Sequence, residues 1–192
     1  MKKNIYLDYA STTPTDPKVV KAMEPYWTKY YGNPSSLYQL GLKSKEAITE
    51  AKLKISQLLN CQSDEIIFTG GGTESINLAL KGVMNKVKDG HIITSATEHH
   101  AVLHTTDSLK KSGHSVSILP VDAEGLIKLT DISKAIKNNT RLVSIMMANN
   151  EIGVIQDIQK IGALLERLNK TRLEKNLPKI YFHTDACQAS GV

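Results

Sequence analysis

Three consecutive glycines stand at a point in the sequence where a phosphate group could bind. Gly70, Gly71 and Gly72 follow the apolar run "IIFT" and precede a segment with helical periodicity that begins at Thr73. Backbone N–H groups exposed at such a helix start can bind an anion. The stretch is not GxGxxG and lacks the lysine of a nucleotide-binding P-loop. It therefore predicts either a phosphate loop of another kind or a tight turn capped by Thr73.

A group of histidines follows the next apolar run, "HIITS". His99 and His100 lie where this run passes into a second helical segment, and His104 is one turn beyond His100. Histidines at i and i+4 on a helix can bind zinc, but HExxH is absent and no third ligand lies nearby in sequence. An imidazole here could instead stack on a flat ligand or carry protons. We expect His99 to face a ligand, with a metal site or a plain surface position as the alternatives.

Amide and carboxylate side chains follow two later apolar runs. Asn149 and Asn150 come after "RLVSIMMA", where their amides could bind a carboxylate or phenolic oxygen or simply form a turn. Asp185 and Gln188 come after "KIYFHT". A carboxylate at this place could stabilise a protonated ring nitrogen. A phosphate loop, a stacking ring and such an acid together predict a pyridoxal phosphate site.

The segments that must position these residues alternate between short apolar runs and amphipathic stretches. The expected strands are residues 65–69, 91–95, 115–120, 141–148 and 179–184. The expected helices are residues 17–31, 44–60, 73–87, 98–113, 130–139 and 157–170, the first with Asp16 as N-cap and Gly32 past its end. This alternation is typical of βαβ units and predicts an α/β fold with a mainly parallel sheet covered on both faces. In such sheets ligands bind beyond the carboxyl ends of the strands, where all four groups stand.

Composition narrows the class of protein. The net charge of +5 arises from 24 Lys and Arg against 19 Asp and Glu, and these charges are scattered. Nucleic-acid binding is not expected, because it requires a basic stripe. No apolar run approaches the length of a membrane span, and the N-terminus lacks the apolar core of a signal peptide. Two distant cysteines, Cys61 and Cys187, give no disulfide framework. We expect a cytoplasmic protein without a membrane partner.

The sequence also resembles a known family along almost its whole length. The segments "YLDYASTTPTDP", "YGNPSS", "IIFTGGGTESINLALKG", "HIITSATEH", "VSIMMANNEIGVIQDI" and "FHTDACQASG" are similar, in the same order, to those of NifS-type cysteine desulfurases. These belong to the class V aminotransferases with the fold type I pyridoxal phosphate architecture. The resemblance implies a three-layer large domain, here incomplete at its C-terminal side. It implies an N-terminal arm of residues 1–15 and a partial cofactor-binding domain of residues 16–192.

The resemblance implies a role for each candidate residue. Gly72 and Thr73 would hold the cofactor phosphate, and His99 would stack on the pyridine ring and act in catalysis as an acid or base. Asp185 would pair with the ring nitrogen, and Gln188 would bind the phenolic oxygen. The residue that would orient the substrate amino acid is Asn150. No metal is implied.

The implied reaction converts L-cysteine to L-alanine and leaves sulfur as a persulfide on an enzyme cysteine. A sulfur-acceptor protein serving iron–sulfur cluster formation or tRNA thiolation would be the partner, and the enzyme would be a homodimer. The chain departs from the family in lacking the Ser-x-His-Lys motif, whose lysine forms a Schiff base with the cofactor, and the persulfide cysteine. Tyr38 also replaces a usual histidine. We therefore expect the N-terminal part of a longer enzyme, inactive by itself.

Three alternatives remain open at this point. One is a selenocysteine lyase or another class V member, and a second is a non-catalytic remnant that binds the cofactor or a partner. The third is a metal-dependent hydrolase built on His99, His100, His183 and Asp185.

Overall fold

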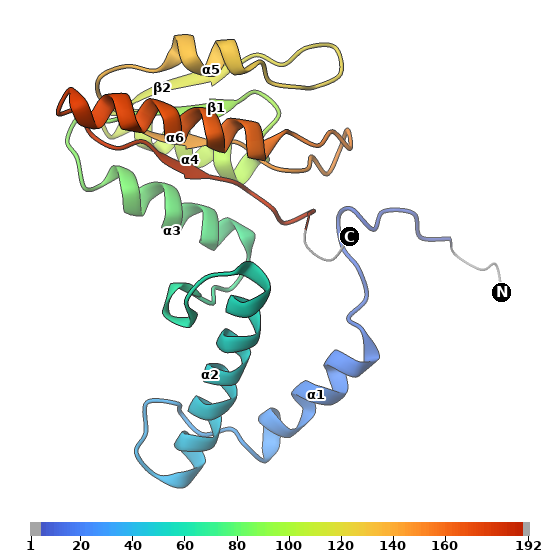
Figure 1. Ribbon diagram of the computed structural model, residues 1–192. Helices are drawn as coiled ribbons and strands as arrows, with labels where there is room; N and C mark the ends of the chain where they lie inside the picture. Colours follow the sequence, from blue (N-terminus) through green and yellow to red (C-terminus); the bar gives the residue numbers. More distant parts are fainter. Residues whose placement is uncertain (1–4, 190–192) are drawn as a thin grey trace. The chain divides into compact units, whose positions relative to one another are not determined.

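The computed structural model describes residues 5–189 (Figure 1). The chain divides by its contacts into two compact units, residues 1–68 and 69–192. This division falls at a different place from the predicted boundary at residue 15. It does not test whether residues 16–192 belong to one larger domain, which stays a prediction.

The first unit contains two helices, both near their predicted positions. Helix α1 spans Pro17–Thr28, and the side chain of its N-cap, Asp16, accepts a hydrogen bond from the Lys18 N–H at 2.7 Å. Helix α2 spans Gln39–Leu59 and ends at Asn60, which adopts the left-handed conformation with φ of 52°. A short 3₁₀ helix, η1, follows at Ser63–Glu65.

The second unit is built on a parallel sheet of four strands in the order β2-β1-β3-β4. The strands are β1 (His91–Ser95), β2 (Ser115–Leu119), β3 (Thr140–Ser144) and β4 (Tyr181–His183). All five residues of β1 are buried, as expected for a central parallel strand covered on both faces. This confirms the predicted α/β class and the parallel sheet.

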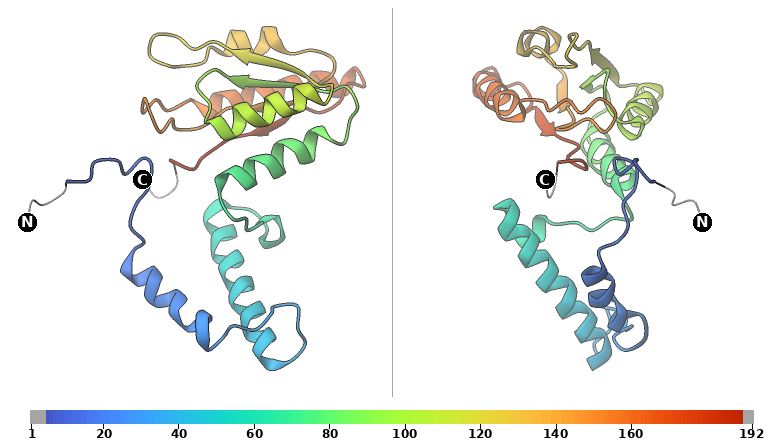
Figure 2. Two further views of the ribbon diagram at one scale, coloured as in Figure 1. Left: turned by 180° about the vertical axis from the view of Figure 1, so that it is seen from behind. Right: turned by 90° about the vertical axis from the view of Figure 1, so that its right-hand side faces the viewer.

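Two pairs of helices cover the two faces of this sheet (Figure 2). Helices α3 (Gly72–Met84) and α4 (His100–Lys111) share one core with Ile92. Helices α5 (Leu129–Ala135) and α6 (Ile158–Glu174) share the other core with Ile93. Because neighbouring strand residues point to opposite faces, Ile92 and Ile93 each serve one core. The result is the expected three-layer arrangement.

The predicted strand at residues 65–69 is wrong. Glu65 ends η1, and residues 66–69 lie outside every strand that the structure describes. Ile66 has the extended backbone of a strand, with φ of −86° and ψ of 122°. The apolar run supplies β propensity, but no neighbouring strand pairs with it among the described residues. Ile67 and Phe68 are accordingly 67% and 51% exposed.

Candidate functional site

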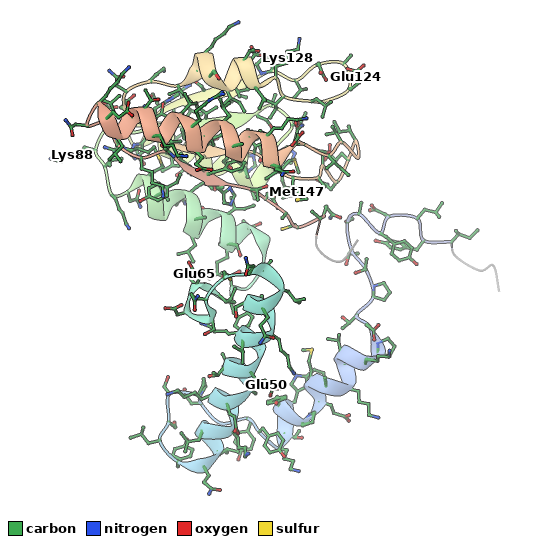
Figure 3. All side chains as sticks on the ribbon, in the orientation of Figure 1. Glu50, Glu65, Lys88, Glu124, Lys128 and Met147 are labelled. Carbon is green, nitrogen blue, oxygen red and sulfur yellow. The ribbon has the colours of Figure 1, made fainter. Side chains whose placement is uncertain are left out.

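The segments that follow β1, β3 and β4 meet at the carboxyl edge of the sheet. Beyond the strands, the N–H of Ile145 donates to the His183 carbonyl at 3.1 Å, and the N–H of Met147 donates to the Asp185 carbonyl at 2.8 Å. Met147 lies at the opposite end of the sheet from Lys88, which precedes β1 (Figure 3). The predicted site residues in these segments therefore gather along one edge, as the βα alternation requires.

The glycine loop leads directly into α3. Gly71 is the N-cap and offers no side chain. The first helical hydrogen bond is donated by the Ser75 N–H to the Gly71 carbonyl at 3.1 Å. Within residues 5–189 nothing accepts from the N–H groups of Gly72, Thr73 and Glu74. These groups carry the positive end of the helix dipole. This helix start can therefore bind an anion.

One anion already contacts the same loop. The carboxylate of Glu74 accepts a hydrogen bond from the Gly70 N–H at 2.6 Å through Oε2. The N–H groups of the glycine loop thus lie in an orientation that a negatively charged oxygen can reach. Thr73 is exposed in the first turn of α3.

The glycine loop packs against the segment that follows β4. A Cβ atom at Gly72 would lie 3.0 Å from the Sγ atom of Cys187. The Cys187 N–H in turn donates to Oδ1 of Asp185 at 3.0 Å. Gly72 and Asp185 are therefore neighbours, with Cys187 between them. Gln188 lies exposed in the turn that follows.

Asp185 combines burial with a fixed orientation. The residue is 8% exposed, and both its carboxylate and its carbonyl accept backbone hydrogen bonds. Burial raises the pKa of the neighbouring Cys187 thiol to about 11, and the Asp185 carboxylate adds to this effect. Cys187 is thus a thiol at neutral pH, so it is a poor nucleophile.

His99 caps helix α4 with its own ring. Its Nδ1 atom accepts a hydrogen bond from the Ala101 N–H at 3.1 Å. A neutral His99 ring with this contact carries its proton on Nε2, the atom on the far side of the ring. The ring is exposed and lies 6.3 Å from that of His100. His99 can therefore stack on a ligand or donate a hydrogen bond through Nε2–H.

His99 and Asn150 line one cavity of about 220 Å³. The preceding residue, Asn149, organises this loop: its amide donates to the Thr97 carbonyl at 2.7 Å, and its Oδ1 accepts from two backbone N–H groups. Thr73, Asp185 and Gln188 do not line this cavity. The site thus has two parts, one around His99 and Asn150 and one around Gly72 and Asp185.

A residue that the sequence did not single out joins these two parts. Glu98 is 5% exposed, and its Oε1 accepts from the Ser95 hydroxyl at 2.9 Å and the Met146 N–H at 2.8 Å. Burial raises the pKa of Glu98 to about 7 against the effect of these hydrogen bonds, and the charge of Asp185 adds to the rise. The only sequence signal was an acidic residue at the end of a buried strand.

The alternative of a metal-dependent hydrolase requires a cluster of metal ligands. In residues 5–189, no three His, Cys, Asp or Glu side chains gather closely enough to hold a metal ion. His183 instead bonds the Ser144 hydroxyl at 2.9 Å, and burial lowers its pKa. Among the helices in this range, none is long and apolar enough to cross a membrane.

Comparison with known proteins agrees with the arrangement at the sheet edge. The sequence profile of the class-V aminotransferases matches residues 5–191. The chain belongs to this family. Members of the family depend on pyridoxal phosphate.

The relatives are cysteine desulfurases. The chain is 50% identical over 193 residues to the cysteine desulfurase IscS of Clostridium botulinum (strain Kyoto / Type A2), covering all of this chain and 46% of that protein. It is 47% identical, with the same coverage, to the cysteine desulfurase IscS of Dictyoglomus turgidum (strain DSM 6724 / Z-1310). The chain thus spans about half the length of the curated relatives it matches.

Two solved structures share the fold. A NifS-like protein aligns with a TM-score of 0.89 and 35% identity, covering 96% of this chain and 49% of that one. SspA in complex with cysteine aligns with a TM-score of 0.86 and 38% identity, covering 96% of this chain and 51% of that one. This class-V aminotransferase chain therefore has the large-domain fold that the sequence predicted, and it corresponds to about half of each structure.

Proposed function

We propose that this chain is the cofactor-binding N-terminal part of a cysteine desulfurase that uses pyridoxal phosphate to convert L-cysteine to L-alanine. The observation that carries the proposal is the contact between the glycine loop and the segment of Asp185, through Gly72 and Cys187. It brings an anion-binding helix start next to a buried carboxylate. A cofactor with a phosphate group and a basic ring nitrogen requires this pair of partners.

The residues of the glycine loop fit the phosphate end of the cofactor. The N–H groups at the start of α3 have no acceptor among the described residues, and the Gly70 N–H already accommodates a carboxylate. Gly72 and Thr73 would bind the phosphate oxygens, with the Thr73 hydroxyl as a further donor. The Glu74 carboxylate would have to leave the Gly70 N–H, because two anions repel each other.

The residues around Asp185 fit the ring. The Asp185 carboxylate would pair with the protonated ring nitrogen, Gln188 would donate to the phenolic oxygen, and the His99 imidazole would stack on the ring face. When bound, the cofactor supplies an electron sink that weakens bonds at the α-carbon of the amino acid. His99 would donate a hydrogen bond through Nε2–H, and an acid or base role would require Nδ1 to give up the Ala101 N–H. Asn150 would orient the substrate in the cavity that it shares with His99.

The sulfur step needs residues that this sequence does not contain. Covalent catalysis requires the lysine of a Ser-x-His-Lys motif and a reactive cysteine. Cys187 does not meet this need, since its raised pKa keeps the thiol protonated. We therefore expect the 192-residue chain alone to be inactive. The whole protein would be a cytoplasmic homodimer that passes sulfur to an acceptor protein for iron–sulfur clusters or tRNA thiolation.

A chimera tests this function. The residues of the Clostridium botulinum relative that follow its matched region would be joined to Val192, and the product assayed for alanine from L-cysteine with pyridoxal phosphate. Alanine formation that is lost in the Asp185→Ala chimera supports the proposal. A folded chimera that binds pyridoxal phosphate without forming alanine favours a non-catalytic remnant. Turnover of selenocysteine in strong preference to cysteine favours a lyase.

A further inference from the structure

Glu98 is a buried carboxyl group to which the proposed function gives no role. One of its oxygens, Oε1, receives two hydrogen bonds, from the Ser95 hydroxyl and the Met146 N–H. The other, Oε2, is buried and has no hydrogen-bond partner among residues 5–189. The two oxygens of the same carboxyl group therefore have unlike surroundings.

This asymmetry favours the neutral form of Glu98. An ionised carboxylate would place negative charge on a buried oxygen without a donor, which is more costly than burying a neutral group. The nearby Asp185 would add repulsion between like charges. The cavity that Glu98 lines also contains the titratable residues His99, His100 and Glu151, whereas residues 146–150 carry no titratable side chain. The pKa of about 7 agrees with this conclusion.

The contacts of Glu98 also place it between the two parts of the site. It directly precedes His99, the N-cap of α4, and it fixes the backbone of Met146 at the end of β3. The next N–H along the chain, that of Met147, holds the carbonyl of Asp185 at 2.8 Å. One side chain therefore connects the ring that would stack on the cofactor with the acid that would face the ring nitrogen.

We propose that Glu98 is a positioning residue that acts as a neutral carboxylic acid. It keeps His99 and Asp185 in fixed positions relative to each other. The negative charge at the ring nitrogen then comes from Asp185 alone. This role rests on the proposed function, because it concerns the same cofactor site. Glu98 also lines the cavity that His99 and Asn150 share, but the proposed role depends on its hydrogen bonds to Ser95 and Met146 and not on contact with a substrate.

The first experiment needs no cofactor. Glutamate labelled with carbon-13 at the side-chain carboxyl would be incorporated, and the Glu98 resonance assigned by its loss in Glu98→Gln. We expect this resonance to titrate near pH 7 and its midpoint to fall in Asp185→Asn. A midpoint in the ordinary acidic range of glutamate overturns the neutral-acid role, whether or not the chain binds a cofactor.

The second experiment measures binding of pyridoxamine 5'-phosphate, which needs no lysine, at about pH 6. Glu98→Gln, a neutral mimic, should bind within about threefold of the unmodified chain. Glu98→Ala should bind about tenfold or more weakly, with ring absorbance closer to that of the free compound. Arg172→Met is the control: Arg172 anchors loops at the amino ends of the strands, so it should lower stability and leave the bound-ring absorbance unchanged.

The outcomes separate the two proposals. Binding by Glu98→Ala equal to that of the unmodified chain overturns the positioning role. Binding by Glu98→Gln as weak as by Glu98→Ala overturns the neutral form and indicates that the charge itself matters. Failure of the unmodified chain to bind overturns the proposed function, while the carbon-13 titration still decides the protonation state of Glu98.

Discussion

The Cα position of Gly72 and the sulfur of Cys187 lie so close that a methyl group on Gly72 would come within 3.0 Å of Sγ. This contact joins the start of α3 to the segment after β4, residues more than a hundred positions apart in the sequence. It leaves room for hydrogen at Gly72 and for little else. The affinity of the glycine loop for a phosphate group is expected to depend on this contact.

Gly72→Ala should weaken pyridoxamine 5'-phosphate binding by about tenfold, because the new methyl group would press on the Cys187 Sγ atom beside the phosphate loop. Cys187→Ala should restore most of the affinity in the double variant, since it removes the atom that the methyl group meets. Gly82→Ala is the matched control in the same helix, where nothing lies within 4 Å of an added Cβ. The measurement is a binding titration, and a double variant as weak as Gly72→Ala would contradict the expected contact.

The thiol of Cys187 should react slowly with iodoacetamide at neutral pH and reach half its maximal rate near pH 11. Burial and the adjacent Asp185 carboxylate both disfavour the thiolate. In Asp185→Asn the midpoint should move to lower pH, because the negative charge is gone. The rates are measured in a Cys61→Ser background, so that only one thiol reacts. Equal midpoints with and without Asp185 would assign the whole rise to burial.

Stability should fall on acidification through His91. This buried ring bonds the Thr140 hydroxyl at 2.8 Å and the Ser117 hydroxyl at 2.9 Å, and burial lowers its pKa from 6.5 to about 4. The folded state therefore resists protonation that the unfolded chain accepts. The contribution of the neutral ring is complete above pH 6.5 and is lost as pH falls towards 4, up to about 3 kcal/mol.

Urea unfolding at several pH values between about 4 and 6.5 measures the contribution of His91 to the free energy of unfolding. His91→Gln should be less stable than the unmodified chain at neutral pH, because it cannot reach both hydroxyls. Its free energy of unfolding should also change less over the same pH interval. A pH dependence as steep as that of the unmodified chain would place the responsible group elsewhere.

Arg172→Met should lower the free energy of unfolding by about 2–4 kcal/mol. The guanidinium donates to the carbonyls of Pro178, Lys137, Asn138 and Thr140, at distances from 2.8 to 3.2 Å. Methionine fills the space but leaves these carbonyls without their donor. Arg167→Met, on the exposed side of the same helix, should change stability by less than about 0.5 kcal/mol. Equal losses of stability in the two variants would contradict a contribution from the hydrogen bonds of Arg172 to these carbonyls.

Local sequence patterns were sufficient for most of the second unit. Its strands are short apolar runs, of which the central β1 and β3 are almost fully buried, so the alternation with amphipathic helices identifies them without tertiary information. Residues 65–69 show where this reasoning fails. An apolar run favours extended backbone, but pairing depends on a neighbour that local sequence does not specify. The strand order β2-β1-β3-β4 was likewise not predicted.

The sequence was sufficient to predict where the candidate site lies, but not the hydrogen bonds that connect its residues. The rule that ligands bind at the carboxyl ends of parallel strands predicted that His99, Asn150 and Asp185 share one edge of the sheet, where the structure places them, and their binding roles stay predictions. Glu98 was missed as a site residue because its environment comes from Met146, 48 positions away. Its pKa is raised by burial first and by the charge of Asp185 second, against the effect of the Met146 hydrogen bond, and no spacing within the "TEHH" stretch indicates this environment.

The backbone contacts at this edge also have a consequence for motion. Met146 N–H is held by Glu98, and Met147 N–H is held by Asp185, so adjacent amides depend on two different segments. Solvent would therefore reach each amide when its own acceptor segment opens, and the deuterium uptake of these adjacent amides would follow two separate rates.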